Sequence, residues 1–346
     1  MTAAPSPSGR GIDAPGLAAA VLAGNRRALA KAITLVESTR LDHQDAAQRL
    51  LERLLPATGQ AARIGISGVP GVGKSTFIES FGLHLIERGM RVAVLAVDPS
   101  SARSGGSILG DKTRMQQLSV AAEAFIRPSP AAGSLGGVAR RTREAMLVCE
   151  AAGYDAILVE TVGVGQSEFA VASMVDFFLV LMLAGAGDEL QGMKKGILEL
   201  ADGLAINKAD GDNRDRAQRA AAELQSALRL FRPRSPHWEP PVLQVSALEG
   251  RGMDAVWDAV ARFRTALGAS GELAEKRRSQ QHDWLWAMLD DGLKRHFVGR
   301  TDVAAALPDI ERAVHENQLT PTEGARRLLA LLDEHRPSLG AAAAPA

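Results

Sequence analysis

Short apolar runs alternate with helical stretches through the middle of the chain. Six runs have the length and composition of buried strands, at residues 63–67, 91–97, 156–159, 176–183, 203–206 and 242–245. A helical pattern over residues 74–89 joins the first two runs, so these strands form a β-α-β unit and are parallel. Strands that alternate with helices form a mostly parallel sheet covered on both faces. The pattern therefore predicts an α/β core.

Helical patterns flank this core on both sides. Before it, helical spacing extends from residue 17 to 55, with a second helix starting near Asp42 as its cap. After it, helical patterns cover residues 253–267, 272–298 and 301–332, with Pro308 and Pro321 as breaks or starts. Trp284 and Trp286 favour a helix–helix or subunit contact over a place in the core. We predict three parts: an N-terminal tail and helical extension over 1–60, with the tail itself over 1–15; the α/β domain over 61–265; and a C-terminal helical arm and tail over 266–346.

Composition narrows the class of protein. The 346 residues carry 40 Lys and Arg against 40 Asp and Glu, so the formal net charge is zero. A protein without net positive charge is not expected to bind nucleic acid or an anionic membrane by general electrostatic attraction. Cys149 is the one cysteine, which excludes an internal disulfide, and its apolar neighbours predict a small buried thiol. The chain starts without the pattern of an export signal, and its most apolar stretch, residues 175–187, is short and contains Asp176. We therefore expect a cytoplasmic protein.

The strongest motif lies between the first predicted strand and the helix after it. It matches the phosphate-binding pattern G-x-x-x-x-G-K-[ST] and consists of Gly68, Val69, Pro70, Gly71, Val72, Gly73, Lys74 and Ser75, followed by Thr76. Glycines let backbone N–H groups turn inward around phosphate oxygens, and the start of the helix adds positive charge. Lys74 supplies an ammonium at the β- and γ-phosphates, and Ser75 offers a hydroxyl to Mg²⁺. The motif predicts a nucleoside-triphosphate site.

A second motif predicts that the base is guanine. Asn207, Lys208 and Asp210 match N-K-x-D at the end of an apolar run. The Asp210 carboxylate can accept from the N1–H and 2-amino groups of guanine, whereas adenine lacks both donors and would leave a buried carboxylate unpaired at a cost of about 1–3 kcal/mol. The stem of Lys208 would pack over the base. The next strand is followed by a loop that fits a backbone contact to the guanine oxygen and consists of Ser246, Ala247 and Leu248.

Acidic residues near the ends of the strands are candidates for the Mg²⁺ site. Glu160 ends the run 156–159 and can reach the Mg²⁺ shell, while Gly163 can bring its N–H to the γ-phosphate. Asp98 and Asp111 flank a Ser/Gly-rich segment that suits a switch loop around Mg²⁺ and the γ-phosphate. Capping aspartates in a strand-end turn are the alternative, and the sequence leaves open which of the two contacts the metal. The candidate catalytic residues are Lys74, Glu160, Gly163 and Asp98.

The residue after Gly163 bears on the rate of hydrolysis. Ras-like proteins place a glutamine there to orient the attacking water, but this chain has Val164. We therefore expect slow intrinsic hydrolysis that a partner stimulates. Gln166 and Glu168 are nearby substitutes, although an interpretation as ordinary solvated loop residues is at least as good.

A glycine-rich, charged segment follows the apolar run that ends at residue 183. It predicts a third mobile loop near the nucleotide, and an ordinary surface loop is the alternative. Its candidate switch residues are Gly187, Asp188, Gln191, Lys194 and Lys195.

Together these segments resemble the MeaB group of SIMIBI-class P-loop GTPases. The P-loop and NKAD are generic to GTPases, and the segments specific to the group are VDPSS (97–101), GDKTRM (110–115), SLGGVARRT (134–142), ETVGVGQSE (160–168) and GAGDELQGMKKG (185–196). The resemblance implies a P-loop NTPase fold with helical extensions, a homodimer formed through the C-terminal arm, and Mg²⁺ near Ser75, Asp98, Asp111 and Glu160. It also implies a partner, the adenosylcobalamin-dependent methylmalonyl-CoA mutase. The GTPase would protect this mutase and gate cofactor loading, with 185–196 as a switch that orders when the mutase binds.

Three other functions compete with this interpretation. A membrane-targeting GTPase of the signal-recognition type is disfavoured, because the nine methionines are spread along the chain and form no Met-rich domain. A metallochaperone GTPase of the same class usually carries Cys or His clusters, whereas this chain has one cysteine and seven scattered histidines. A kinase for a small molecule or a protein would share the P-loop, but the guanine motif disfavours it.

Overall fold

The computed structural model describes residues 12–97, 115–128, 135–161, 167–185, 195–229 and 234–333. The chain divides into two compact units, Met1–Gln280 and Gln281–Ala346. No helix among the described residues has the length and apolar character needed to cross a membrane.

A seven-stranded sheet forms the centre of the first unit. Its strands are β1 (Ala62–Gly68), β2 (Val92–Val97), β3 (Ala124–Arg127), β4 (Ala156–Thr161), β5 (Phe177–Leu183), β6 (Gly203–Asn207) and β7 (Val242–Gln244). The order is β3-β2-β4-β1-β5-β6-β7, and every neighbouring pair is parallel. All six predicted strands are confirmed, and β3 is an additional strand at one edge. Strands β1 and β2 are parallel as predicted, but β4 lies between them. Because the strands are parallel, the carboxyl ends of β1, β4 and β6 meet at one edge of the sheet.

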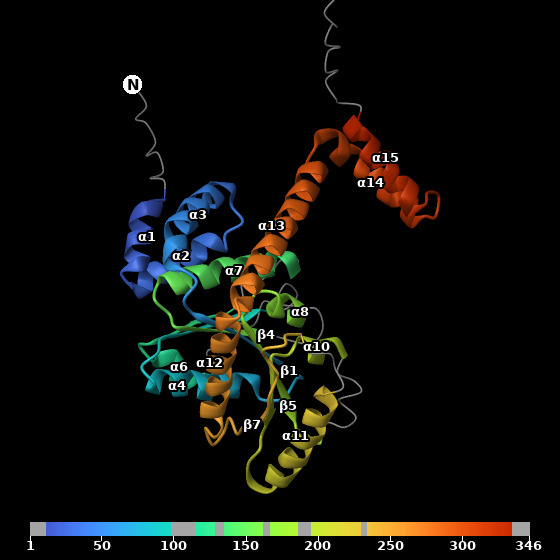
Figure 1. Cartoon of the computed structure of the whole chain (residues 1–346). Coiled ribbons are helices and arrows are strands. Elements are labelled where there is room, and N and C mark those ends of the chain that lie inside the picture. The colour runs from blue at the N-terminus through green and yellow to red at the C-terminus, as the bar shows by residue number, and fades with distance from the viewer. Residues whose placement is uncertain are drawn as a thin grey trace, which may run out of the picture. The chain divides into compact units, whose positions relative to one another are not determined.

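Helices cover both faces of this sheet. They are α4 (Lys74–Glu87), α6 (Gln116–Val120), α7 (Leu135–Ala151), α8 (Ser167–Ala172), α10 (Lys195–Leu200), α11 (Arg214–Leu228) and α12 (Met253–Ala269). Figure 1 shows these helices around the sheet. Alternate residues of β4 point to opposite faces, so Leu158 lies in one buried cluster with residues of α4, α6 and α12, while Ile157 and Val159 lie in another with residues of α7, α8 and α11. The predicted α/β core is therefore confirmed.

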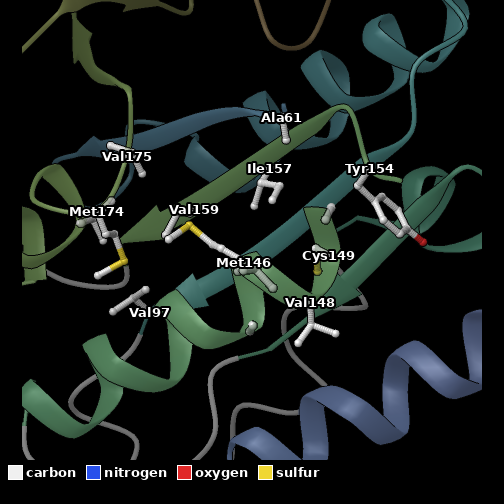
Figure 2. Packing of buried hydrophobic residues seen from close by; sticks show 14 of the residues in the cluster. Ala61, Val97, Met146, Val148, Cys149, Tyr154, Ile157, Val159, Met174 and Val175 are labelled. Carbon is white, nitrogen blue, oxygen red and sulfur yellow. The ribbon is translucent and has the colours of Figure 1, made fainter. Parts of the chain in front are cut away.

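Figure 2 shows the layer between α7 and β4. Met146 and Cys149 of α7 lie in the same cluster as Ile157 and Val159 of β4. Cys149 is a free thiol, and it is fully buried, as predicted. Burial raises the pKa of its thiol well above the ordinary value, so the side chain behaves as an apolar one.

The N-terminal extension consists of α1 (Ala14–Leu22), α2 (Arg26–Val36) and α3 (Leu41–Leu54), which pack on α7. The predicted helical stretch is interrupted at Asn25, whose side chain caps α2 by accepting from the N–H groups of Arg27 and Ala28. Two predictions were wrong in detail. Asp42 does not cap α3, because the helix begins one residue earlier and Asp42 pairs with Arg40 instead. The predicted tail over 1–15 is too long, because α1 begins at Ala14.

The first turns of α13 (Glu272–Val298) are fixed to the amino ends of the strands by buried ion pairs. The Arg277 guanidinium donates to both carboxylate oxygens of Asp176, at 2.8 and 2.6 Å, and to the carbonyl oxygens of Gly59 and Ala61. Lys276 donates to the Asp202 carboxylate at 3.1 Å. These contacts lie before β1, β5 and β6, at the edge of the sheet opposite the P-loop. Helix α13 is therefore attached to the α/β domain by its first turns.

The second unit contains the rest of α13, together with α14 (Thr301–His315) and α15 (Pro321–Asp333), which pack on each other. Pro321 starts a helix as predicted, but the break predicted at Pro308 is wrong, because α14 continues through it. A proline removes one intrahelical hydrogen bond, and α14 tolerates this loss while it packs on α15.

Candidate functional site

The P-loop connects the carboxyl end of central strand β1 to the start of α4. Gly73 is the cap of α4 and has a left-handed φ of 94°. A Cβ at this position would lie 2.9 Å from the side-chain nitrogen of Asn207, and a Cβ at Gly68 would lie 2.6 Å from the carbonyl oxygen of Leu181. Only glycine therefore fits these two positions, and the backbone turns back on itself as a phosphate cradle requires.

Lys74 lies folded into this loop. Its Nζ donates to the carbonyl oxygen of Gly68 at 2.7 Å and to that of Val69 at 3.3 Å. Burial lowers the pKa of the Lys74 ammonium, and the negative charges of Glu160 and Glu168 oppose that effect. The lysine is thus held, half-buried, beside the space that the loop encloses.

The side chains of Ser75 and Glu160 place two oxygen atoms that could bind a metal next to Lys74. The Ser75 hydroxyl donates to Oε1 of Glu160 at 3.2 Å, and Glu160 is 5% exposed at the end of β4. Hydroxyl and carboxylate oxygens suit Mg²⁺, so these two residues fit the metal that the sequence predicts. Among the described residues, no group of three or more His, Cys, Asp or Glu side chains is arranged to hold a metal.

The guanine motif lies beside the P-loop and is bonded to it. The side-chain N–H of Asn207 donates to the carbonyl oxygen of Val72 at 2.8 Å, and Nζ of Lys208 donates to that of Gly71 at 2.9 Å. On its other side, Asn207 accepts from the N–H of Ala247 at 3.1 Å. The structure therefore joins β6, the P-loop and the loop after β7 into one site.

Asp210 points to the same loop. Its Oδ2 accepts from the hydroxyl of Ser246 at 2.5 Å, which holds the carboxylate in place. Leu248, two residues further on, is 82% exposed. A cavity of about 450 Å³ opens between this loop and α4, and its lining includes Thr76, Ala247 and Leu248. Val72 of the P-loop and Asn207 of the guanine motif are 135 residues apart in the sequence, and the two motifs thus meet at one edge of the sheet.

Comparison with known proteins agrees with this geometry. Residues 29–302 match the family described as methylmalonyl Co-A mutase-associated GTPase MeaB. The chain belongs to the MeaB family. It is 50% identical over 305 residues to the protein named GTPase ArgK of Escherichia coli, covering 88% of this chain and 92% of that protein.

Two further relatives support the assignment. The mouse protein named methylmalonic aciduria type A homolog, mitochondrial, is 50% identical over 316 residues, covering 88% of this chain and 76% of the mouse protein. The solved structure titled "Crystal structure of LAO/AO transport system kinase" superposes with a TM-score of 0.73 at 42% identity, covering 92% of this chain and 97% of that one. The chain is therefore a SIMIBI-class P-loop GTPase: it binds guanine nucleotides and hydrolyses GTP.

Several predicted site residues of this MeaB-family chain lie outside the described part. They are Asp98, Asp111, Gly163, Gly187, Asp188, Gln191 and Lys194. Lys195 begins α10, but its side chain is also outside the description. The described structure thus brings together the P-loop, Glu160 and the guanine motif.

The interpretation of Glu168 as a solvated loop residue was wrong. Glu168 lies in the first turn of α8 and is 1% exposed, and its charge acts on Lys74. Gln166, the other substitute, lies outside the described residues.

Sequence analysis missed two residues that contact the guanine motif. Nδ2 of Asn213 donates to the carbonyl oxygen of Lys208 at 2.7 Å, and the Arg251 guanidinium donates to that of Ala209. Asn213 lies only three residues after the motif, in a Gly-Asp-Asn turn, which was a usable signal. Arg251 lies beyond the next strand, and nothing in the sequence indicated its contact with Ala209.

A second cavity lies elsewhere. Its volume is about 1140 Å³, its lining includes Trp238 and Phe263, and it touches none of the predicted site residues. We assign the chemistry to the P-loop site, because that is where the phosphate-binding loop, the oxygen donors and the base motif converge.

Proposed function

We propose that this GTPase is a chaperone of the adenosylcobalamin-dependent methylmalonyl-CoA mutase. It uses GTP binding and hydrolysis to gate cofactor loading and to protect the mutase from inactivation. The observation that carries the proposal is the match of residues 29–302 to a family named for association with this mutase. The name of the mouse relative, which refers to methylmalonic aciduria, points to the same metabolism.

The site residues have distinct roles in this proposal. The backbone N–H groups of residues 68–76, apart from Pro70, which has none, and the Lys74 ammonium hold the phosphates. Asn207, Lys208 and Asp210, with residues 246–248, hold the guanine base. Ser75 and Glu160 hold Mg²⁺, together with Asp98 and Asp111. Mg²⁺ held there would offset the negative charge of the phosphates.

Two segments complete the proposed switch. Gly163 would bring its N–H to the γ-phosphate, and the segment 185–196 would be a switch that orders when the mutase binds. Val164 stands where a water-orienting glutamine would be, so the mutase supplies or positions the missing element.

The decisive experiment is GTP hydrolysis by the purified protein with and without the mutase. We expect slow GTP turnover alone and a rise of about tenfold or more with the mutase, which corresponds to lowering the barrier by at least about 1.4 kcal/mol. ATP in place of GTP is the control and should not turn over. GTP turnover that is indifferent to the mutase would leave a GTPase with another client, such as a metal-delivery pathway.

We also propose that the protein is a homodimer formed through its C-terminal arm, over residues 266–346, with the GTPase domain over 61–265. The support is an apolar stripe along α13 in the second unit, formed by Leu285, Trp286, Leu289 and Leu293, which are 65%, 52%, 45% and 58% exposed. Their spacing places them on one side of the helix. A second copy of the arm would remove this stripe from water.

A charge in the middle of the stripe is expected to dissociate the dimer. Leu289→Glu should convert the protein to a monomer in sedimentation velocity, because a carboxylate buried at the interface would be unpaired. Ala287→Glu adds the same charge about 160–200° around the helix from Leu285 and Leu289 and should leave the dimer intact. A dimer that survives Leu289→Glu would contradict this interface.

A further inference from the structure

Lys208, in the guanine motif, has a backbone conformation that is costly for its residue type. Only two described non-glycine residues have positive φ, Lys208 at 58° and Asn317 at 57°. Asparagine tolerates this left-handed region, but lysine has a Cβ that crowds the backbone, at a cost of about 1–2 kcal/mol. Neighbouring groups must therefore hold Lys208 in place.

Asn213 holds the motif at both ends of the turn. It ends the short 3₁₀ helix η2 (Gly211–Asn213). Its side-chain Nδ2 donates to the carbonyl oxygen of Lys208 at 2.7 Å, and its backbone N–H donates to that of Asp210 at 2.9 Å. The two hydrogen bonds from Asn213 thereby close residues 208–210 into a small loop.

The left-handed turn at Lys208 lets the residues on its two sides, Asn207 and Asp210, face different partners. Before it, Asn207 is 1% exposed and bonds Val72 and Ala247. After it, Asp210 turns to the Ser246 hydroxyl, at the side of the site proposed for the base. If Lys208 relaxed to negative φ, Asn207 and Asp210 could not both keep these contacts.

We propose that Asn213 is a positioning residue for guanine recognition, whose side-chain amide holds Lys208 in the left-handed conformation that presents Asp210 to the base. This inference rests on the proposed base site. Asn213 does not touch the nucleotide in this arrangement. It acts through the backbone of Lys208, and this makes a specific prediction.

The test is a double-mutant cycle between Asn213→Ala and Lys208→Gly, read as affinity for GDP and ADP by calorimetry. Asn213→Ala should lower GDP affinity by roughly tenfold, or about 1.4 kcal/mol, and leave ADP affinity unchanged. Glycine adopts positive φ without cost. In the Lys208→Gly background, therefore, Asn213→Ala should change GDP affinity by less than about twofold. The two losses would then differ by about fivefold or more, which is the non-additivity expected of residues in contact.

Two matched variants sharpen the result. Asn213→Asp keeps the shape of the side chain but replaces the donor with an acceptor, so it should lower GDP affinity at least as much as alanine does. Asp212→Ala changes the neighbouring exposed residue of the same turn and should leave GDP affinity unchanged. Thermal unfolding without nucleotide checks that each variant is folded.

The outcomes separate this inference from the proposed base site. An equal loss of GDP affinity in both backgrounds would overturn the role of Asn213, as would an equal loss for GDP and ADP. Asp210→Asn, run in parallel, should shift preference from GDP to xanthosine diphosphate, because the acceptor becomes partly a donor. If that shift is absent the base site itself is wrong, and if it is present with an additive cycle only the inference about Asn213 fails.

Discussion

Replacing Lys74 with alanine is expected to weaken binding of GDP and GTP by roughly 100-fold or more. A hydrogen bond from a charged donor is worth about 1.5–3 kcal/mol, and the lysine would make at least two to the phosphates. Each 1.4 kcal/mol is about a factor of ten in affinity. Calorimetric titration with each nucleotide measures the loss.

The structure explains why so large an effect is expected at this position. The Lys74 ammonium is already half-buried in the loop, where it is held by the carbonyl oxygens of Gly68 and Val69. Burial lowers its pKa, so the protonated form gains more from a bound phosphate than a solvated lysine would. Because the side chain is already ordered, phosphate binding loses little free energy to restricting its motion.

The control is a lysine of the same chain away from the site. Lys31→Ala changes an exposed residue of α2 and should leave both affinities unchanged. Thermal unfolding without nucleotide establishes that Lys74→Ala is folded. Full nucleotide affinity in a folded Lys74→Ala protein would show that the P-loop assignment is wrong.

The features that sequence predicts well here are those with a local signal. Buried parallel strands are continuous apolar runs, so β1, β2, β4, β5 and β6 were all recognisable. Edge strand β7 is not itself buried, and it was recognisable because its apolar run continues to the buried Val245. Strand β3 is an edge strand of only four residues, two of them half-buried, and its pattern is too short to stand out. The P-loop and the guanine motif are likewise contiguous, and their meeting followed from the parallel sheet.

The features that sequence missed depend on contacts between distant residues. Arg277 and Asp176 are 101 residues apart, and no periodicity links them. One signal was present, because Asp176 is a charged residue at the start of an apolar run, and a buried carboxylate requires a partner. The partner itself could only be found once α13 was placed.

The second large effect is expected at this anchor. Arg277→Met should destabilise the first unit by about 3–5 kcal/mol, because it leaves the Asp176 carboxylate buried without its cation. The Asp176 side chain is 1% exposed and that of Arg277 is 16% exposed. Burial alone would lower the pKa of the Arg277 guanidinium, but its hydrogen bonds and ion pair with Asp176 outweigh burial and leave the pKa raised. Thermal unfolding of the full chain should show a decrease of roughly 6–20 °C.

The neighbouring arginine provides a matched control. Arg278 pairs with Glu275, but these side chains are 65% and 68% exposed, and such surface pairs contribute about 0–1 kcal/mol. Arg278→Met should therefore change the unfolding temperature little, although it removes the same charge one residue away.

A double variant separates the cost of the unpaired charge from the loss of packing. Asp176→Asn with Arg277→Met removes both charges, and the asparagine oxygen can still accept the 3.1 Å hydrogen bond from the N–H of Arg63. Because replacing both members of a buried pair is often close to neutral, this variant should recover much of the stability that Arg277→Met loses. If Arg277→Met were no more destabilising than Arg278→Met, the ion pair could not be what holds α13 to the sheet, and the bonds from Lys276 and Gln280 to the same strand start would have to suffice.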